Sequence, residues 1–334
     1  MEVSGTGLTD KKIYYVNDLN INNGYYQFNR HRTPQAYMEL FPWSSLKWND
    51  LQSIGSGNII FVQTPTSNEA KKLSLLLSII DSNTVFINQE TNIFDWFDWT
   101  AEAQQLYIQC LTKCKAFCYH NEHDKKVMEV FVTYPYKFIK YPGCVNLISE
   151  EVKNINDGQY ISIAGPFKRY QRGMIVHKLI HDVVSDDIEV RCMRYNRPPE
   201  GVGITNLSFP DSYSLGNMKF QNFMQVDEWI AYIYNSKFGI DIQRDFSCGN
   251  NCIEFASLGV PLIGNIQLDC QRDIYPYTSF EYNDYDSIKQ CINRLLKDSD
   301  FYHLISKTAL ENVNKMYNSK TIVEKFKQDI INIL

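Results

Sequence analysis

The 334-residue sequence lacks a long hydrophobic run. Its longest apolar segment, Leu73–Ile80, has eight residues and contains two serines, whereas a membrane-spanning helix needs about 20 apolar residues. No basic stretch leads into an apolar run near the N-terminus, as it would in a secretory signal. We therefore expect no membrane span and no secretory signal. We expect a cytoplasmic protein.

An excess of positive charge is also missing. The chain has 33 Lys and Arg against 38 Asp and Glu, a net charge of −5, and a pI of about 5.7. Bulk charge of this sign does not attract nucleic acid or anionic lipid, although a local basic cleft is compatible with it. Internal repeats and low-complexity blocks are absent as well.

The nine cysteines do not form a disulfide pattern, because their number is odd and they are scattered over a large chain. Such usage favours a reducing compartment. Cys110, Cys114 and Cys118 recur every four residues, yet no second pair of ligands has zinc spacing. His177 and His181 lie four residues apart without a third ligand. We predict buried thiols, structural or solvated histidines, no metal site and no requirement for a divalent cation.

Two series of alternating strands and helices are present instead. The first has β-prone runs at 12–16, 58–62, 84–88, 115–119 and 138–143 and helical spacing at 69–80, 101–114 and 124–130. After the polar segment 150–158, the second has strands at 160–165, 188–192, 238–242 and 261–264 and helices at 174–184, 227–234, 250–258, 286–297, 301–317 and 322–333. Strand–helix–strand order predicts parallel sheets. The sequence therefore predicts an α/β fold with two Rossmann-like doubly wound domains that face each other.

A glycine and three cations follow the first strand of the second series. Gly165 ends that strand and would let backbone amides approach a phosphate closely. Lys168, Arg169 and Arg172 come next and could bind a pyrophosphate, which Arg can hold with two parallel hydrogen bonds. The alternative is a solvated basic turn before a surface helix.

Small residues also open the helix at 250–258, which ends at Gly259. The amides of Gly249, Asn250 and Asn251 could hold phosphate or sugar hydroxyls. Glu254, one turn into the helix, could accept hydrogen bonds from both ribose hydroxyls. The alternative is an ordinary capped helix in which Glu254 interacts with the helix dipole.

These two segments together resemble the nucleotide-sugar glycosyltransferases of the GT-B fold, whose donor domain has a strand–Gly–basic loop and a later Glu-x-x-x-x-Gly-x-Pro stretch. Here that stretch runs from Glu254 to Pro261. Within this superfamily the sequence resembles phage DNA glucosyltransferases, which modify hydroxymethylated bases. Residues 165–172 are similar to the Gly-Ser-Phe-Arg-x-x-Gln-Arg donor loop of the β-type enzymes, and residues 236–261 are similar to the α-type. The likeness extends weakly over most of the chain.

The resemblance implies a central cleft between an acceptor-side domain, 1–149, and a donor domain, 150–320, with a C-terminal helix, 321–334, able to cross back to the first domain. It implies a monomer with a UDP-sugar donor and no tightly bound cofactor, located in the host cytoplasm if the protein is viral. The acceptor partner would be double-stranded DNA with hydroxymethylated pyrimidines. Lys168 and Arg172 would hold the diphosphate, and Glu254 would hold the ribose.

The same resemblance implies that Glu90, just after strand 84–88, is the catalytic base, which would take the proton of the acceptor hydroxyl. The alternative is a solvent-facing loop residue. The sequence departs from the β-type pattern, in which Asp precedes an Ile-Arg pair, because Thr91 and Asn92 follow Glu90. It also lacks the paired glutamates of many retaining enzymes, since Phe246 stands eight residues before Glu254. Inverting and retaining chemistry both stay open.

Further acceptor-side candidates lie in the first series. Arg30, His31 and Arg32 follow the loop after the first strand and would face the cleft. Trp96, in the aromatic run 94–99, could stack on a base or a sugar ring, although aromatic runs more often belong to a core. Two rival functions remain: a GT-B enzyme acting on a polysaccharide, lipid or protein, which the acidic pI favours, and a non-catalytic nucleotide-sugar-binding protein.

Overall fold

The chain divides into two compact units in the computed structural model, which describes residues 11–17, 37, 44–63, 70–89, 97–132, 137–146, 148–166, 173–185, 187–193, 218–221, 224, 226–242 and 249–334. Unit 1 comprises Met1–Pro142, Phe246–Cys248 and Ser319–Leu334, and unit 2 comprises Gly143–Asp245 and Gly249–Asn318. The domain limits and roles expected from the sequence, 1–149, 150–320 and 321–334, stay predictions.

Unit 1 is built on a six-stranded sheet with the order β2-β1-β3-β4-β5-β6. All of its described strand pairs are parallel. The elements are β1 (Ile13–Asn17), β2 (Ser44–Lys47), the 3₁₀ helix η1 (Trp48–Ser53), β3 (Ile59–Gln63), α2 (Ala70–Ile80), β4 (Thr84–Asn88), α3 (Ala101–Lys113), β5 (Ala116–Tyr119), α4 (Glu122–Met128), β6 (Phe138–Lys140) and α11 (Ser319–Ile333).

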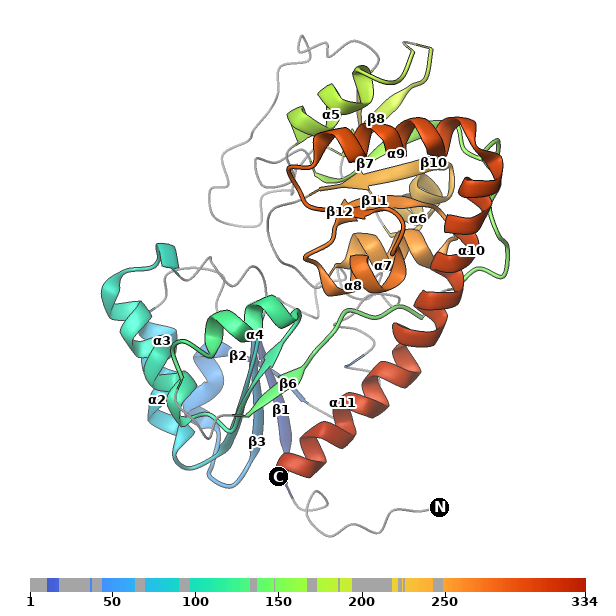
Figure 1. Ribbon diagram of the computed structural model, residues 1–334. Helices are drawn as coiled ribbons and strands as arrows, with labels where there is room; N and C mark the ends of the chain where they lie inside the picture. The colour runs from blue at the N-terminus through green and yellow to red at the C-terminus, as the bar shows by residue number, and fades with distance from the viewer. Residues whose placement is uncertain are drawn as a thin grey trace. The chain divides into compact units, whose positions relative to one another are not determined.

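The sheet of unit 1 is covered on both faces, which explains why its central strands are apolar throughout. Figure 1 shows α2 and α3 on one face and α11 on the other. Alternate strand residues such as Ile60, Val62 and Val85 belong to the core beneath α2 and α3. On the opposite face Phe61 stacks on Phe86, with ring centroids 4.9 Å apart.

Helix α11 contributes Phe326 to that second face. Its ring lies 5.1 Å from Tyr37, 5.2 Å from Tyr141 and 6.2 Å from Phe61, centroid to centroid, and its side chain is buried. Tyr37 also donates a hydrogen bond to the carbonyl oxygen of Pro142 at 3.1 Å. The last helix of the chain therefore completes the core of the unit that contains the first strand.

Unit 2 has a second six-stranded sheet, in the order β12-β11-β10-β7-β8-β9, and its described strand pairs are again all parallel. The elements are β7 (Tyr160–Pro166), α5 (Gly173–His181), β8 (Val190–Met193), β9 (Met218–Gln221), α6 (Val226–Tyr234), β10 (Ser236–Asp241), α7 (Asn250–Ser257), β11 (Leu262–Asn265), α8 (Asp269–Ile274), β12 (Ser279–Phe280), α9 (Tyr285–Lys297) and α10 (Ser299–Met316). Figure 1 shows α5 and α9 on one side of this sheet and α7 and α8 on the other. The predicted pair of parallel, doubly wound α/β sheets is confirmed.

The polar segment 150–158 contains no helix or strand, belongs to unit 2 and packs on other parts of that unit. The backbone amide of Lys153 donates to Ser306 Oγ of α10 at 2.9 Å, and its ammonium group donates to the carbonyl oxygen of Tyr234, the last residue of α6. A Cβ atom at Gly158 would lie 2.3 Å from the backbone nitrogen of Lys237. The segment is therefore fixed against unit 2 by specific contacts.

Five short elements were not predicted from the sequence: β2, η1, β9, α8 and β12. Three of them are strands at or near the sheet edges, with four, four and two residues. Edge strands have one unpaired side and need no continuous apolar run, so β2 is Ser-Ser-Leu-Lys and is largely exposed. Helix α4 begins at Glu122, two residues before its predicted start.

Candidate functional site

In unit 2 the strand order reverses between β7 and β10. The chain adds β8 and β9 on one side of β7 and then returns to add β10, β11 and β12 on the other. Ligands of open α/β sheets bind at the carboxyl ends of the strands that flank such a switch point. Those ends are Gly165–Pro166 on β7 and Asp241 on β10.

The end of β7 is irregular. Its register against β8 shifts between Ile163 and Pro166, so Gly165 lies within a bulge-like part of the strand. The segment 167–172, which contains Lys168, Arg169 and Arg172, lies outside the described residues, and α5 begins at Gly173. The three cations therefore stay predictions, while Gly165 is located at the switch point.

Gly249 precedes α7 in the left-handed conformation, with φ of 73°. A Cβ atom there would lie 1.9 Å from the buried Cys270 Sγ. Both the backbone angle and the contact with Cys270 favour glycine, since residues with a Cβ atom rarely adopt this conformation. The helix thus begins at a tightly packed turn.

One face of α7 carries the other predicted donor residues. Asn250, Asn251 and Glu254 are its half-buried residues, and its other five residues are buried. Their spacing of three and four places them on the same side of the helix. Asn251 Nδ2 donates to Asp241 Oδ2 at 3.0 Å, which joins this face to the carboxyl end of β10. The structure therefore brings Asn250, Asn251 and Glu254 together beside the switch point.

Glu254 has a partner that sequence reasoning missed. The indole nitrogen of Trp229, on α6, donates to Glu254 Oε2 at 2.6 Å. One carboxylate oxygen is thus already a hydrogen-bond acceptor within the protein. The two residues are 25 positions apart, so no local sequence signal indicates the pair.

In unit 1 the carboxyl edge of the sheet is lined by amide and imidazole side chains. Gln63 ends β3, Asn88 and Gln89 end or follow β4, and His120 and Asn121 follow β5. All five side chains are buried. Sequence reasoning singled out none of them as site residues, although each ends an apolar strand or lies within two residues of its end.

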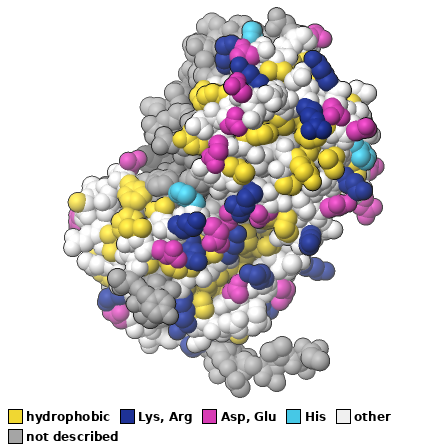
Figure 2. Space-filling view, viewed as in Figure 1, with side chains coloured by type: hydrophobic (Ala, Val, Ile, Leu, Met, Phe, Trp, Pro, Cys, Tyr) yellow, Lys and Arg dark blue, Asp and Glu magenta, His cyan; other side chains and the backbone are white. Residues whose placement is uncertain are grey.

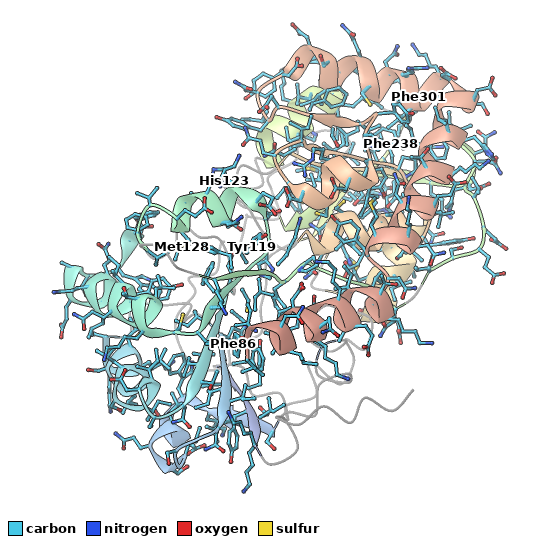
Figure 3. All side chains as sticks on the ribbon, turned by 60° about the horizontal axis from the view of Figure 1, so that its bottom comes forward. Phe86, Tyr119, His123, Met128, Phe238 and Phe301 are labelled. Carbon is cyan, nitrogen blue, oxygen red and sulfur yellow. The ribbon has the colours of Figure 1, made fainter. Side chains whose placement is uncertain are left out.

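A buried carboxylate connects these side chains. Asp124 Oδ2 accepts from Gln89 Nε2 at 2.7 Å and from Asn121 Nδ2 at 3.4 Å. Gln89 Oε1 in turn accepts from the backbone amide of His120 at 3.0 Å. Figure 3 labels His123, the neighbour of Asp124 on α4, and its Nδ1 lies 3.9 Å from Asp124 Oδ1. This network ties the end of β4 to the end of β5.

His120 is held in one orientation by the chain around it. Its Nδ1 lies 2.7 Å from the carbonyl oxygen of Tyr141, and its ring stacks on that of Tyr141 at 5.5 Å. Because a carbonyl oxygen only accepts hydrogen bonds, Nδ1 carries a proton and donates it to Tyr141.

The remaining acceptor-side predictions fall outside the described residues: Glu90, Trp96, Arg30, His31 and Arg32. Two neighbours of Trp96 are described. Trp99 is buried in the core and lies 5.5 Å from Tyr107, whereas Phe97 is 40% exposed and lies 5.8 Å from Phe131. The aromatic run therefore includes both a core residue and a surface residue.

The described cysteines are free and buried, as predicted. Burial raises the pKa of the Cys110 thiol to about 12, so this thiol stays protonated at neutral pH. His177 is buried and His181 is exposed, with ring centroids 6.3 Å apart. Within the described ranges no group of His, Cys, Asp and Glu has the arrangement of a metal site, and no helix is long and apolar enough to span a membrane.

No protein-family model and no curated protein sequence matches the chain. Solved structures do. HepE from Anabaena, in complex with UDP and glucose, has 9% identity and a TM-score of 0.66 over 96% of this chain and all of its own. Sucrose-phosphate synthase from Thermosynechococcus elongatus has 11% identity and a TM-score of 0.65, over 97% of this chain and 99% of its own. The fold is of the GT-B type.

Two further similar structures differ in how much of their chains is matched. TarM has 11% identity and a TM-score of 0.65, and the match covers 84% of this chain but only 57% of TarM. An α-glucosyltransferase in complex with UDP and a 13-mer DNA containing an HMU base has 12% identity and a TM-score of 0.59, over 86% of this chain and 85% of its own. The likeness to these structures confirms the predicted fold class, with two Rossmann-like domains.

Proposed function

We propose that this chain is a glycosyltransferase that moves a hexosyl or pentosyl unit from a UDP-sugar to the hydroxyl group of a hydroxymethylated pyrimidine in double-stranded DNA. In this proposal it acts as a cytoplasmic monomer without a tightly bound cofactor. The observation that carries it is the switch point of unit 2, where Gly165 lies at the carboxyl end of β7 and the half-buried face of α7 lies beside the end of β10.

The donor would bind at this switch point. The first amides of a helix are hydrogen-bond donors without partners in the helix, and they favour anionic groups. The amides that follow Gly249 would hold phosphate or sugar hydroxyls, and Lys168, Arg169 and Arg172 would neutralise the diphosphate. Glu254 would accept from the ribose. UDP is the nucleotide in the HepE and α-glucosyltransferase complexes.

Reaction chemistry would come from unit 1. The acceptor oxygen would form a bond to the anomeric carbon while the bond from that carbon to the diphosphate breaks and UDP leaves. In an inverting reaction Glu90 would take the hydroxyl proton, and in a retaining reaction the donor phosphate would take it. Glu90 directly follows Gln89, whose backbone amide donates to Cys118 and whose side chain is bound to Asp124.

The DNA acceptor is supported by the sequence resemblance of residues 165–172 and 236–261 to phage DNA glucosyltransferases. It is also supported by the structural likeness to the α-glucosyltransferase that was solved with DNA containing an HMU base. A base inside a duplex must be extruded before its hydroxyl can react. Binding to phosphates would also weaken steeply as the salt concentration rises.

The charge distribution favours a second candidate, a GT-B transferase with a polysaccharide, lipid or protein acceptor. Unit 1 contains 16 basic and 16 acidic residues, and unit 2 contains 17 and 22. On the face shown in Figure 2, the coloured Lys and Arg side chains are interspersed with Asp and Glu. Neither observation indicates the large positive field that is typical of DNA-binding surfaces.

A donor screen followed by a transfer assay tests the proposal. UDP-sugars should raise the melting temperature of the full chain, because a ligand that binds only the folded state stabilises it. Labelled sugar should then appear on hydroxymethylated DNA and not on unmodified DNA. Transfer to a carbohydrate, lipid or protein instead would favour the second candidate, and failure to bind any nucleotide sugar would contradict both.

The Glu90→Gln variant separates binding from chemistry in the same assay. If Glu90 is the base, transfer should fall by about 10²–10⁴-fold while UDP-sugar affinity stays close to that of the wild type. Glu324→Gln, at an exposed position of α11, is the matched control. Full activity of Glu90→Gln on hydroxymethylated DNA would rule out the inverting-base assignment and leave the donor site standing.

A further inference from the structure

Glu254 is held by a hydrogen bond from a different helix. The indole nitrogen of Trp229 lies 2.6 Å from Glu254 Oε2, a short distance for an N–H donor and a carboxylate. An indole nitrogen can only donate, so the direction of this bond is unambiguous. The bond fixes one end of a side chain that is otherwise only half buried.

Trp229 is itself rigidly packed. Its side chain is 4% exposed, and its ring stacks on Tyr232 with centroids 5.3 Å apart and planes at 16°. It meets Phe255 of α7 edge to face, with centroids 6.5 Å apart. These neighbours prevent the indole from rotating away from Glu254.

The packing around Trp229 continues to the strand at the switch point. Tyr232 accepts a hydrogen bond at its hydroxyl from Ser162 Oγ at 2.9 Å, and its carbonyl oxygen accepts from the Tyr160 hydroxyl at 2.6 Å. Both Tyr160 and Ser162 belong to β7, whose end carries Gly165. The orientation of the Glu254 carboxylate is therefore set relative to the strand that would position the diphosphate.

A glutamate on a helix surface ordinarily samples several rotamers, and a ligand that uses it must restrict them. Here the Trp229 hydrogen bond restricts Glu254 before a ligand arrives. A preoriented acceptor binds a hydroxyl group more tightly than a mobile one because less freedom is lost on binding.

We propose that Trp229 is a positioning residue, which orients Glu254 so that the site selects ribonucleotide over 2′-deoxyribonucleotide diphosphates. This inference rests on the proposed donor site at α7. Trp229 makes no contact with the nucleotide in this arrangement and acts only through Glu254. If Trp229 only packed the core, its replacement would weaken the binding of both kinds of nucleotide equally. If Trp229 positions Glu254, its replacement affects the binding of the nucleotide that has the 2′-hydroxyl.

The test measures the dissociation constants of UDP and 2′-deoxy-UDP for the full-length wild type and for Trp229→Phe, which keeps an aromatic ring but removes the N–H donor. The wild type should bind UDP more tightly than 2′-deoxy-UDP. Trp229→Phe should weaken the affinity for UDP by about 10-fold, equivalent to about 1.4 kcal/mol. It should leave the affinity for 2′-deoxy-UDP within about two-fold. In a Glu254→Gln background the Trp229→Phe change should have no further effect on the UDP to 2′-deoxy-UDP ratio.

Two more variants keep the test decisive. Glu254→Asp shortens the carboxylate side chain and breaks the same hydrogen bond without altering the aromatic core, so it should also lose the preference for UDP. Trp48→Phe is the matched control, because Trp48 is buried in unit 1 and its indole N–H has no hydrogen-bond partner among the described residues. Its nucleotide affinities should equal those of the wild type.

The outcomes distinguish this inference from the donor assignment. If Trp229→Phe weakens the binding of UDP and of 2′-deoxy-UDP equally, the positioning role is wrong. It is also wrong if Glu254→Asp keeps the wild-type preference for UDP over 2′-deoxy-UDP. A wild type that binds UDP without preferring it to 2′-deoxy-UDP would overturn the inference and leave the donor site intact. A wild type that binds neither nucleotide would overturn the proposed donor site together with the inference.

Discussion

The carboxyl edges of the two sheets present different chemistry on the same architecture. In unit 1 the strands lead into buried Gln63, Asn88, Gln89 and His120, and the network from Gln89 to Asp124 joins two strand ends. In unit 2 the corresponding positions lead into a glycine-containing bulge and the first turn of α7. One edge is thus fixed by side chains, and the other is shaped by the backbone.

The two sheets also differ in how the chain covers them. Helices α5 to α9 of unit 2 are close in sequence to strands that they contact, whereas one face of the unit 1 sheet is covered by α11, from the other end of the chain. Substitutions at each of these features should therefore affect one unit and spare the other. This difference makes the comparison testable.

The largest effect is expected for Phe326→Ala on α11. Truncation of a buried Phe costs about 3–5 kcal/mol through lost burial and the cavity that remains. Because a two-unit chain need not unfold in one step, residue-resolved hydrogen exchange is the appropriate measurement. Protection should fall in β3, β4 and β6 and persist in β7 and β10.

Ile331→Ala, at a 40% exposed position of the same helix, serves as the control and should change stability by less than about 0.5 kcal/mol. Equal loss of protection in both sheets after Phe326→Ala would show that the two units unfold together. The different helices that cover the two sheets would then make no difference to how each unit unfolds.

An intermediate effect is expected for Gly249→Ala. The left-handed conformation costs a residue with a Cβ atom about 1–2 kcal/mol, and the overlap with Cys270 Sγ adds about 1–3 kcal/mol. Gly57→Ala separates these two causes, since Gly57 has φ of 83° but no heavy atom within 4 Å of the added Cβ. Chemical denaturation should show a larger loss for Gly249→Ala than for Gly57→Ala.

Removal of the sulfur should restore part of that stability. In the Gly249→Ala, Cys270→Ala double variant, the cost assigned to the overlap should largely disappear relative to Cys270→Ala alone. If Gly249→Ala and Gly57→Ala destabilise equally, the close packing beneath the first turn of α7 is not what requires glycine there.

The smallest effect is expected for Asp124→Ala in unit 1. It removes the acceptor for Gln89 and Asn121 and should cost about 1–3 kcal/mol, with exchange increasing at the ends of β4 and β5. Asp124→Asn keeps a side-chain oxygen and should cost less. UDP affinity should be unchanged in both variants, and its loss would contradict the assignment of the donor site to unit 2 alone.

The central strands could be predicted because burial on two faces requires nearly continuous apolar residues, as in Ile59–Val62 of β3. The strands β2 and β12 could not, because an edge strand of four or two residues has no such requirement. Because the central strands have this apolar pattern, most bounds could be predicted to within one or two residues. The edge strands lack the pattern, so the prediction missed them.

Among the candidate site residues, the positions of Gly165 and Gly249 were predictable, since these glycines interrupt regular elements at the points where a strand meets a helix. Asp124 was not, because a charged residue within Glu122–Met128 has the pattern of a solvated helix surface. The Trp229–Glu254 hydrogen bond depends on how α6 packs on α7, and this packing cannot be predicted from the local sequence.

The position of α11 has a consequence for synthesis on the ribosome. Residues up to Asn318 suffice for unit 2, whereas unit 1 begins with the first strand and needs Phe326 to cover Phe61 and Tyr141. At about 5–20 residues per second, roughly 10–40 seconds separate the translation of the last unit 1 strand from that of α11. During that interval one aromatic face of the unit 1 sheet lacks its covering helix, so the unit whose synthesis begins first is the one completed last.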